Sequence, residues 1–229
     1  MKNVYPLHIA TSIFRSLGVL LLIVAAGGCR TGGVASGAPQ IVQPGAPGES
    51  TQVISAVKAV DLSKVQHTPA DVTFMQGMIG HHSQAVEMVE LLKTRTASED
   101  MKKLGLRIEL SQEDEIKMMQ RWLQVRGQEV PGPHAMHMAG AHLMPGMLTQ
   151  EEMAQLAAAT GTEFDRLFLE GMIKHHGGAL TMVSELFATP GAGQEVEIFS
   201  FASDVDSDQR MEIDRMGAML NAIAKERQQ

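Results

Sequence analysis

The amino-acid sequence predicts an all-α protein, a four-helix bundle built from two copies of a helical hairpin. A 22-residue segment recurs further along the chain, and a second, weaker repeat follows each copy. Apolar residues in these segments recur every three or four positions, which is the period of one face of an α-helix. No segment alternates apolar and polar residues as a half-buried strand does. Because two amphipathic hairpins each leave an apolar face to bury, we expect them to pack as one bundle.

The repeat is clearest between residues 71–92 and 165–186, which are offset by 94 positions. Eleven of the 22 paired residues are identical, and they include one His-His pair in each copy. Identity of this extent between two parts of one chain indicates a duplication. The identical pairs include Phe74/Phe168, Gly77/Gly171, Met78/Met172, Ile79/Ile173, His81/His175, His82/His176, Ala85/Ala179 and Met88/Met182.

A weaker repeat, offset by 97 positions, follows each strong one. The two copies together predict long helices over residues 69–95 and 98–126, and over residues 163–188 and 194–226. The paired residues of the weaker repeat are Gln112/Gln209, Glu115/Glu212, Ile116/Ile213, Met119/Met216 and Leu123/Leu220.

Helix-start signals support these boundaries. Thr68 and Asp71 have the spacing of a capping box, with Asp in place of the usual Glu, and Thr162 and Asp165 repeat it. Pro69 stands at the first helical position, where its missing N–H costs nothing. Both helices that carry a His-His pair are therefore expected to begin at a Thr cap.

The repeat places one duplicated bundle domain at residues 68–226. Its halves, 68–126 and 162–226, are joined by a Met- and His-rich linker at residues 127–161. The linker is expected to hold a loop and a short helix that begins after Thr149, which opens a further capping box.

Residues 1–29 have the layout of a secretory signal. A mildly basic start precedes an apolar run of ten residues, which is too short to span a bilayer. Small residues then precede Cys29, as in a bacterial lipobox, so we expect lipidation of Cys29 and an exported protein anchored to a bacterial membrane, in the periplasm or at the cell surface. The alternative is ordinary cleavage nearby, for example after Ala38. Residues 30–67 are expected to form a flexible tether, in which 51–67 could include a short helix.

The composition disfavours nucleic acid as a partner. The chain has a formal net charge of −7 and only 4% aromatic residues. Affinity for phosphate comes from clustered Lys and Arg, and base stacking needs exposed aromatic rings. The chain is instead unusual in having 17 Met and nine His, and eight of the nine His lie in the range from His67 to His176.

The His-His pairs lie on otherwise apolar helix faces. Helical spacing aligns Met78 with His81, and the neighbouring stripe carries His82. A buried imidazole needs a partner for each ring nitrogen, so these residues could be core histidines bonded to a side chain such as Glu115 or Gln112. Four His in two equivalent pairs, each preceded by Met, favour metal binding, and the second copy supplies Met172, His175 and His176.

Ligand chemistry favours copper, as Cu(I), Cu(II) or both. Thioether and imidazole together suit Cu(I), and imidazole also holds Cu(II). A ferritin-like di-iron site uses Glu three residues before His, where this chain has Met78 and Ile79 before His81 and His82. The chain has no His-Glu-x-x-His motif of a zinc protease, so zinc and iron are less favoured. Glu115 and Glu212 keep a carboxylate-bridged site open as the minor alternative.

The linker contains a second cluster of soft ligands. Seven His or Met occur within fourteen residues, which is consistent with a flexible, exchangeable copper site. The alternative is a loop that Met side chains hold against the bundle. The candidate ligands are His134, Met136, His137, Met138, His142, Met144 and Met147.

These paired motifs resemble the family called domain of unknown function 305, which includes CopM-like periplasmic copper-binding proteins. The resemblance covers residues 68–226 and implies a ferritin-like four-helix bundle that binds copper in the cell envelope. The two halves differ at Trp122, whose counterpart in the second half is Met219. By position, the resemblance implies ligands at Met78, His81, His82, Met119, Met172, His175, His176 and Met216.

Three functions remain open at this point. The leading hypothesis is a lipid-anchored protein that sequesters or transfers copper, or confers tolerance to it, with a copper-donor or copper-acceptor protein as partner. The second is a ferritin-like redox enzyme that uses the His pairs with Glu115 and Glu212. The third is a structural or interaction protein without metal. The chain has no nucleophile–base set and no phosphate-binding or cofactor motif.

Overall fold

The computed structural model describes residues 40–43, 50–61, 65–132 and 143–226. Residues 1–29, which the sequence predicts to be a secretory signal ending near Cys29, lie outside the described residues. The chain divides into two units, Met1–Ala56 and Val57–Gln229. Within the described ranges, no helix is long and apolar enough to cross a membrane.

The first unit contains a short antiparallel hairpin, β1 (Ile41–Gln43) and β2 (Gln52–Ile54). Ile41 pairs with Ile54, so the β-branched residues that favour extended backbone lie opposite one another. The sequence predicts a tether without strands here, because three-residue strands are too short to show alternation. The helix α1 (Ala56–Ala59) follows, within the range where a short helix is expected.

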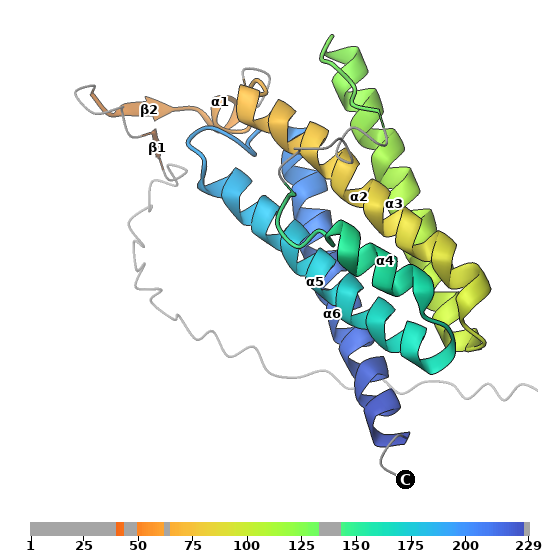
Figure 1. Cartoon of the computed structure of the whole chain (residues 1–229). Coiled ribbons are helices and arrows are strands. Elements are labelled where there is room, and N and C mark those ends of the chain that lie inside the picture. Colours follow the sequence, from red (N-terminus) through yellow and green to blue (C-terminus); the bar gives the residue numbers. More distant parts are fainter. Residues whose placement is uncertain (1–39, 44–49, 62–64, 133–142, 227–229) are drawn as a thin grey trace, which may run out of the picture. The chain divides into compact units, whose positions relative to one another are not determined.

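The second unit is a bundle of four long helices that confirms the predicted fold class. The helices are α2 (Pro69–Arg95), α3 (Glu99–Val125), α5 (Gly161–Ala188) and α6 (Val196–Glu226). Figure 1 shows α2 with α3, and α5 with α6, as the two hairpins, which meet through α2 and α5. The short helix α4 (Gln150–Ala158) packs on α5.

The helix starts follow the predicted caps in one copy and depart from them in the other. Thr68 and Asp71 form a complete capping box at the start of α2. In the second copy, Thr162 does not cap a helix, and that prediction is wrong. The short connection from α4 lets α5 begin at Gly161, one position before Thr162, so Thr162 already lies in the first turn and Thr160 takes the cap position without a side-chain hydrogen bond.

The bundle core consists of two apolar clusters with a polar layer between them. The first cluster joins the beginning of α2, the end of α3, the end of α5 and the beginning of α6; the second joins the opposite ends of the same helices. Each duplicated half therefore contributes to both clusters. The first cluster includes Phe74, Met78, Met119, Val183 and Phe201, and the second includes Met88, Ile108, Phe164, Met172 and Met216.

Candidate metal centre

The polar layer contains the four histidines of the two repeated helices. His81 and His82 come from α2 and His175 and His176 from α5, and each residue is at most 1% exposed. The helical spacing of the sequence predicts this inward orientation. Each copy of the weaker repeat adds a buried Gln and a Glu on the facing helix, namely Gln112 and Glu115 on α3 and Gln209 and Glu212 on α6.

The inner histidines, His81 and His175, lie against each other where α2 meets α5. Their ring centroids are 3.8 Å apart. His81 Nε2 lies 3.0 Å from the carbonyl oxygen of Pro145, and His175 Nε2 lies 2.9 Å from the carbonyl oxygen of His81. Because a carbonyl oxygen can only accept a hydrogen bond, Nε2 carries the hydrogen in both rings.

The outer histidines, His82 and His176, each contact a carboxylate. His82 Nε2 lies 2.5 Å from Glu115 Oε2, and His176 Nε2 lies 2.7 Å from Glu212 Oε2. Glu212 also faces Arg107, with 3.4 Å between the guanidinium Nε and Oε1. The two halves therefore build the same imidazole–carboxylate pair. For His82, the sequence left two interpretations open, and a hydrogen bond to Glu115 was one of them.

The remaining ring nitrogen of all four histidines is Nδ1, and it is buried without a hydrogen-bond partner among the described residues. A buried polar atom without a partner costs about 1–3 kcal/mol, so four equivalent cases at one level of a bundle need an explanation. A hydrogen-bonded core histidine explains only the Nε2 side of each ring. The free Nδ1 atoms fit a bound ion that accepts an electron pair from nitrogen.

Burial keeps the inner histidines neutral. Desolvation, with a smaller repulsion from His82, lowers the pKa of His81 from 6.5 to about 3, although the hydrogen bond to Pro145 opposes this. Desolvation also lowers the pKa of His175 well below 6.5, followed by repulsion from His81. Both rings therefore carry hydrogen on Nε2 and a free lone pair on Nδ1 at neutral pH.

These pKa shifts predict that the metal-free protein loses stability in mild acid. An unfolded histidine takes up a proton near pH 6.5, whereas the folded His81 resists protonation until about pH 3. The stabilising contribution is therefore present above pH 6.5 and is lost as the pH falls from 6.5 towards 3, by about 1.4 kcal/mol per pH unit for each histidine. In urea unfolding between pH 7.5 and 4.5, the free energy of unfolding should fall less steeply with decreasing pH for His81→Gln than for wild type. Equal slopes would contradict the buried neutral state of His81.

The arrangement fits a soft ion of low coordination number better than a closed zinc site. In the part of the chain that the structure describes, no three His, Cys, Asp or Glu side chains surround a common point. A structural zinc ion needs four ligands. Imidazole nitrogen and thioether sulfur are ligands that Cu(I) accepts.

The four bundle methionines that the sequence proposes as ligands lie on both sides of the polar layer. Met78 and Met119 belong to the first apolar cluster, and Met172 and Met216 belong to the second. All four are completely buried. Met78 lies one helical turn before His81, and Met172 lies one turn before His175, so both copies keep the same Met–His spacing.

Only part of the linker cluster can be placed. His134, Met136, His137, Met138 and His142 lie outside the described residues. Met144 is half-buried against the first apolar cluster, and Met147 is 4% exposed. These two methionines therefore pack on the bundle, which was the alternative interpretation of the linker.

Sequence reasoning missed the residues that attach the linker to the polar layer. The Gln84 amide donates to the carbonyl of Leu148 and accepts from its N–H, at 2.9 and 2.7 Å. The equivalent position on α5 is Gly178, where a Cβ atom would lie 1.8 Å from the carbonyl oxygen of Pro145. The linker thus crosses both repeated helices and supplies the acceptor for His81. The available signal was the loss of repeat identity at positions 84 and 178.

Comparisons with known proteins agree with this architecture. The family model described as Domain of unknown function (DUF305) matches residues 71–220. A DUF305 protein from Streptomyces coelicolor, described as secreted, is 30% identical with a TM-score of 0.58, over 68% of this chain and 94% of its own. A DUF305 fragment from Deinococcus radiodurans is 30% identical with a TM-score of 0.59, over 68% and 98%. No curated protein matches the chain.

A metal-bound protein is also similar to this chain. CopM in its Cu(II)-bound form is 30% identical with a TM-score of 0.55, over 66% of this chain and 96% of CopM. CopM structures also exist in Cu(I)-bound, silver-bound and apo forms. The matched family region spans both copies of the repeat, which confirms the resemblance inferred from the paired motifs. The chain belongs to the DUF305 family.

Proposed function

We propose that this protein binds copper in the polar layer of its bundle and sequesters or transfers it in the cell envelope. The observation that carries the proposal is the common state of the four histidines. Each Nε2 is held by an oxygen atom, and each Nδ1 is buried without a partner among the described residues.

The hydrogen bonds to Nε2 have the form that supports metal ligation. A histidine that binds metal through one ring nitrogen usually donates the other N–H to a carboxylate or a backbone carbonyl, which fixes the ring and makes the ligand more basic. The inner pair uses carbonyls and the outer pair uses Glu115 and Glu212. Copper would be held by Nδ1 atoms, with sulfur from Met78, Met119, Met172 or Met216.

Copper and an envelope location are supported by independent observations. The similar CopM structures hold Cu(I), Cu(II) or silver, and the Streptomyces relative is described as secreted. The signal-like residues 1–29 would direct export, and Cys29 would anchor the protein to the membrane by a lipid. A copper donor or acceptor protein would then exchange copper with the Met- and His-rich linker.

The geometry favours binding over redox catalysis. A carboxylate-bridged redox centre would need Glu115 and Glu212 to face a shared metal position together with His. Each carboxylate instead contacts the Nε2 atom of one imidazole, and no three such ligands surround a common point within the described ranges. Both carboxylates are thus suited to orient a ligand.

The proposal predicts a specific effect of Glu115→Gln. Loss of the carboxylate charge should make Nδ1 of His82 a weaker electron-pair donor to the metal. Substitutions of this kind typically weaken metal affinity about 10- to 100-fold. Competition with a colorimetric Cu(I) chelator measures the affinity. Glu113→Gln is the matched control, because Glu113 lies on the same helix, with its side chain 44% exposed and 3.7 Å from Lys117. Unchanged affinity in Glu115→Gln would contradict the orienting role of the carboxylate.

A further inference from the structure

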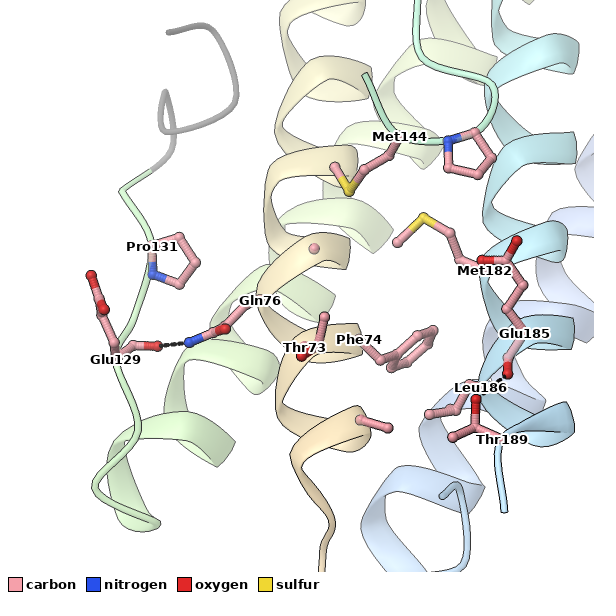
Figure 2. Close-up of a pocket in the computed structure, with 13 residues that line it drawn as sticks. Thr73, Phe74, Gln76, Glu129, Pro131, Met144, Met182, Glu185, Leu186 and Thr189 are labelled. Carbon is pink, nitrogen blue, oxygen red and sulfur yellow. Dashed lines mark hydrogen bonds between the residues drawn. The ribbon is translucent and has the colours of Figure 1, made fainter. Parts of the chain in front are cut away.

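A groove of about 750 Å³ lies between the first half of α2 and the second half of α5. The segments before and after the undescribed part of the linker border it, at Pro131 and at Met144–Pro145. Figure 2 shows the side chains of Met144 and Met182 both extending toward α2, above Phe74. Met144 comes from the linker and Met182 from α5, so two separate parts of the chain bring sulfur to one place.

Gly77 makes room for this sulfur pair. A Cβ atom built at Gly77 would lie 3.2 Å from Met144 Sδ and 3.4 Å from Met182 Cε. The Met144 sulfur and the Met182 methyl group thus approach the backbone of α2, and a Cβ atom at position 77 would press on the Met144 sulfur. A half-buried Met144 beside a nearly buried Met182 gives a ligand pair at the boundary between solvent and core.

The groove has the charge expected of a cation site. Thirteen described residues line it, and Glu129 and Glu185 are its only charged members. Both are exposed at its rim. A soft monovalent cation therefore meets a negative rim and neutral sulfur ligands, which suits Cu(I) or Ag(I) and disfavours a hard cation.

The duplicated fold contains an internal comparison. The equivalent of Gly77 is Gly171, where a Cβ atom would lie 3.1 Å from Leu148 and 3.3 Å from the Cε atom of Met88. Met88 is the repeat counterpart of Met182, but Leu148 replaces the second sulfur. Met88 is also completely buried. One half thus has an accessible sulfur pair, and the other half has a closed apolar contact.

We propose that Met144 and Met182 form a separate binding site for a soft monovalent cation, Cu(I) or Ag(I), at the mouth of this groove. The site would bind the ion before it reaches the bundle interior, so this inference rests on the proposed copper function. Met144 precedes Pro145, whose carbonyl oxygen accepts the hydrogen bond from His81. The site therefore lies one residue from the direct attachment of the linker to the polar layer, where it can collect the ion before the buried histidines do.

Silver titration of the full mature protein, with ¹³C-labelled Met methyl groups, tests the site. Adding Ag(I) should shift the methyl signals of Met144 and Met182 together. Met144→Leu and Met182→Leu should each remove one silver equivalent, or weaken it at least about 10-fold, because either change leaves a single thioether. Met88→Leu is the matched control and should keep that equivalent. Leu and Met have similar volumes, so these variants should remain folded.

Two further variants separate this site from the polar layer. Replacing the outer histidines His82 and His176 by Ala keeps the hydrogen bond from His81 to Pro145, and it should leave the Met144 and Met182 shifts intact whether or not the layer binds copper. Gly77→Ala should weaken those shifts while the helix content is retained, because its Cβ would lie 3.2 Å from the Met144 sulfur and push it away from Met182. If Ag(I) shifts neither methyl group in wild type, or if Met144→Leu and Met182→Leu keep full silver stoichiometry, the groove site is wrong, whereas the histidine proposal is untouched.

Discussion

Replacing His81, His82, His175 and His176 by Ala should abolish the tightest class of copper binding. Changes to groups that merely orient a ligand weaken affinity about 10- to 100-fold, so removal of the ligands themselves should exceed about 100-fold. The bundle positions these side chains on folded helices, so little conformational entropy is lost when the ion binds. Equilibrium competition for Cu(I) and Cu(II) measures the loss.

Stability of the same variant separates a ligand from a core hydrogen-bonder. Removing the imidazoles takes away one hydrogen bond from each of Glu115 and Glu212, although Ser111 and Arg107 still contact these carboxylates. A lost hydrogen bond of this kind costs about 1–3 kcal/mol. Some destabilisation of the metal-free protein is therefore expected under either interpretation. Full copper affinity in a folded but less stable variant would identify these histidines as structural, and the proposed centre would fail.

Gly178→Ala should disrupt the linker attachment and lower stability strongly. Its Cβ would lie 1.8 Å from the Pro145 carbonyl oxygen and 2.7 Å from the Gly146 Cα, so backbone atoms must move. Overpacking of this kind typically costs about 1–3 kcal/mol, and the displaced carbonyl would also release His81. Thermal and urea unfolding of the metal-free protein measure the change.

Gly177→Ala is the matched control for that variant. Among the described residues, none has an atom within 4 Å of a Cβ at Gly177. Because Gly in a helix interior is about 1 kcal/mol less favourable than Ala, this variant should be slightly more stable than wild type. Two adjacent Gly→Ala changes with the same sign and size would show that Pro145 does not lie directly on α5.

Local signals in the sequence were sufficient for most of the fold. The capping box of Thr68 and the 3.6-residue period set the bounds of α2 closely, since both act within a few residues. The start of α5 was misplaced because the connection from α4, a tertiary feature, decides it. The β1–β2 hairpin was missed because its strands have three residues each.

The sequence predicted which residues form the candidate site, but not which of their atoms would face a partner. Helical spacing placed His81 and His175 in the core, but it could not say which ring nitrogen would face an oxygen. That depends on Pro145, which reaches His81 from 64 positions away. Gln84 and Gly178 occupy equivalent positions in the repeat, and their difference marks where the linker crosses the two helices. Pairing Met144 with Met182 likewise required the three-dimensional path of the linker.

The central claim is that copper binds the Nδ1 atoms of the buried histidines, and long-range ¹H–¹⁵N correlation spectra of the imidazoles test it most directly. In the metal-free protein, His81 and His175 should show a protonated Nε2 and an unprotonated Nδ1. Adding Cu(I) should shift the Nδ1 signals of the layer histidines while Nε2 keeps its hydrogen. If copper binds with full affinity and all four Nδ1 signals stay in place, the metal is held elsewhere and the account is contradicted.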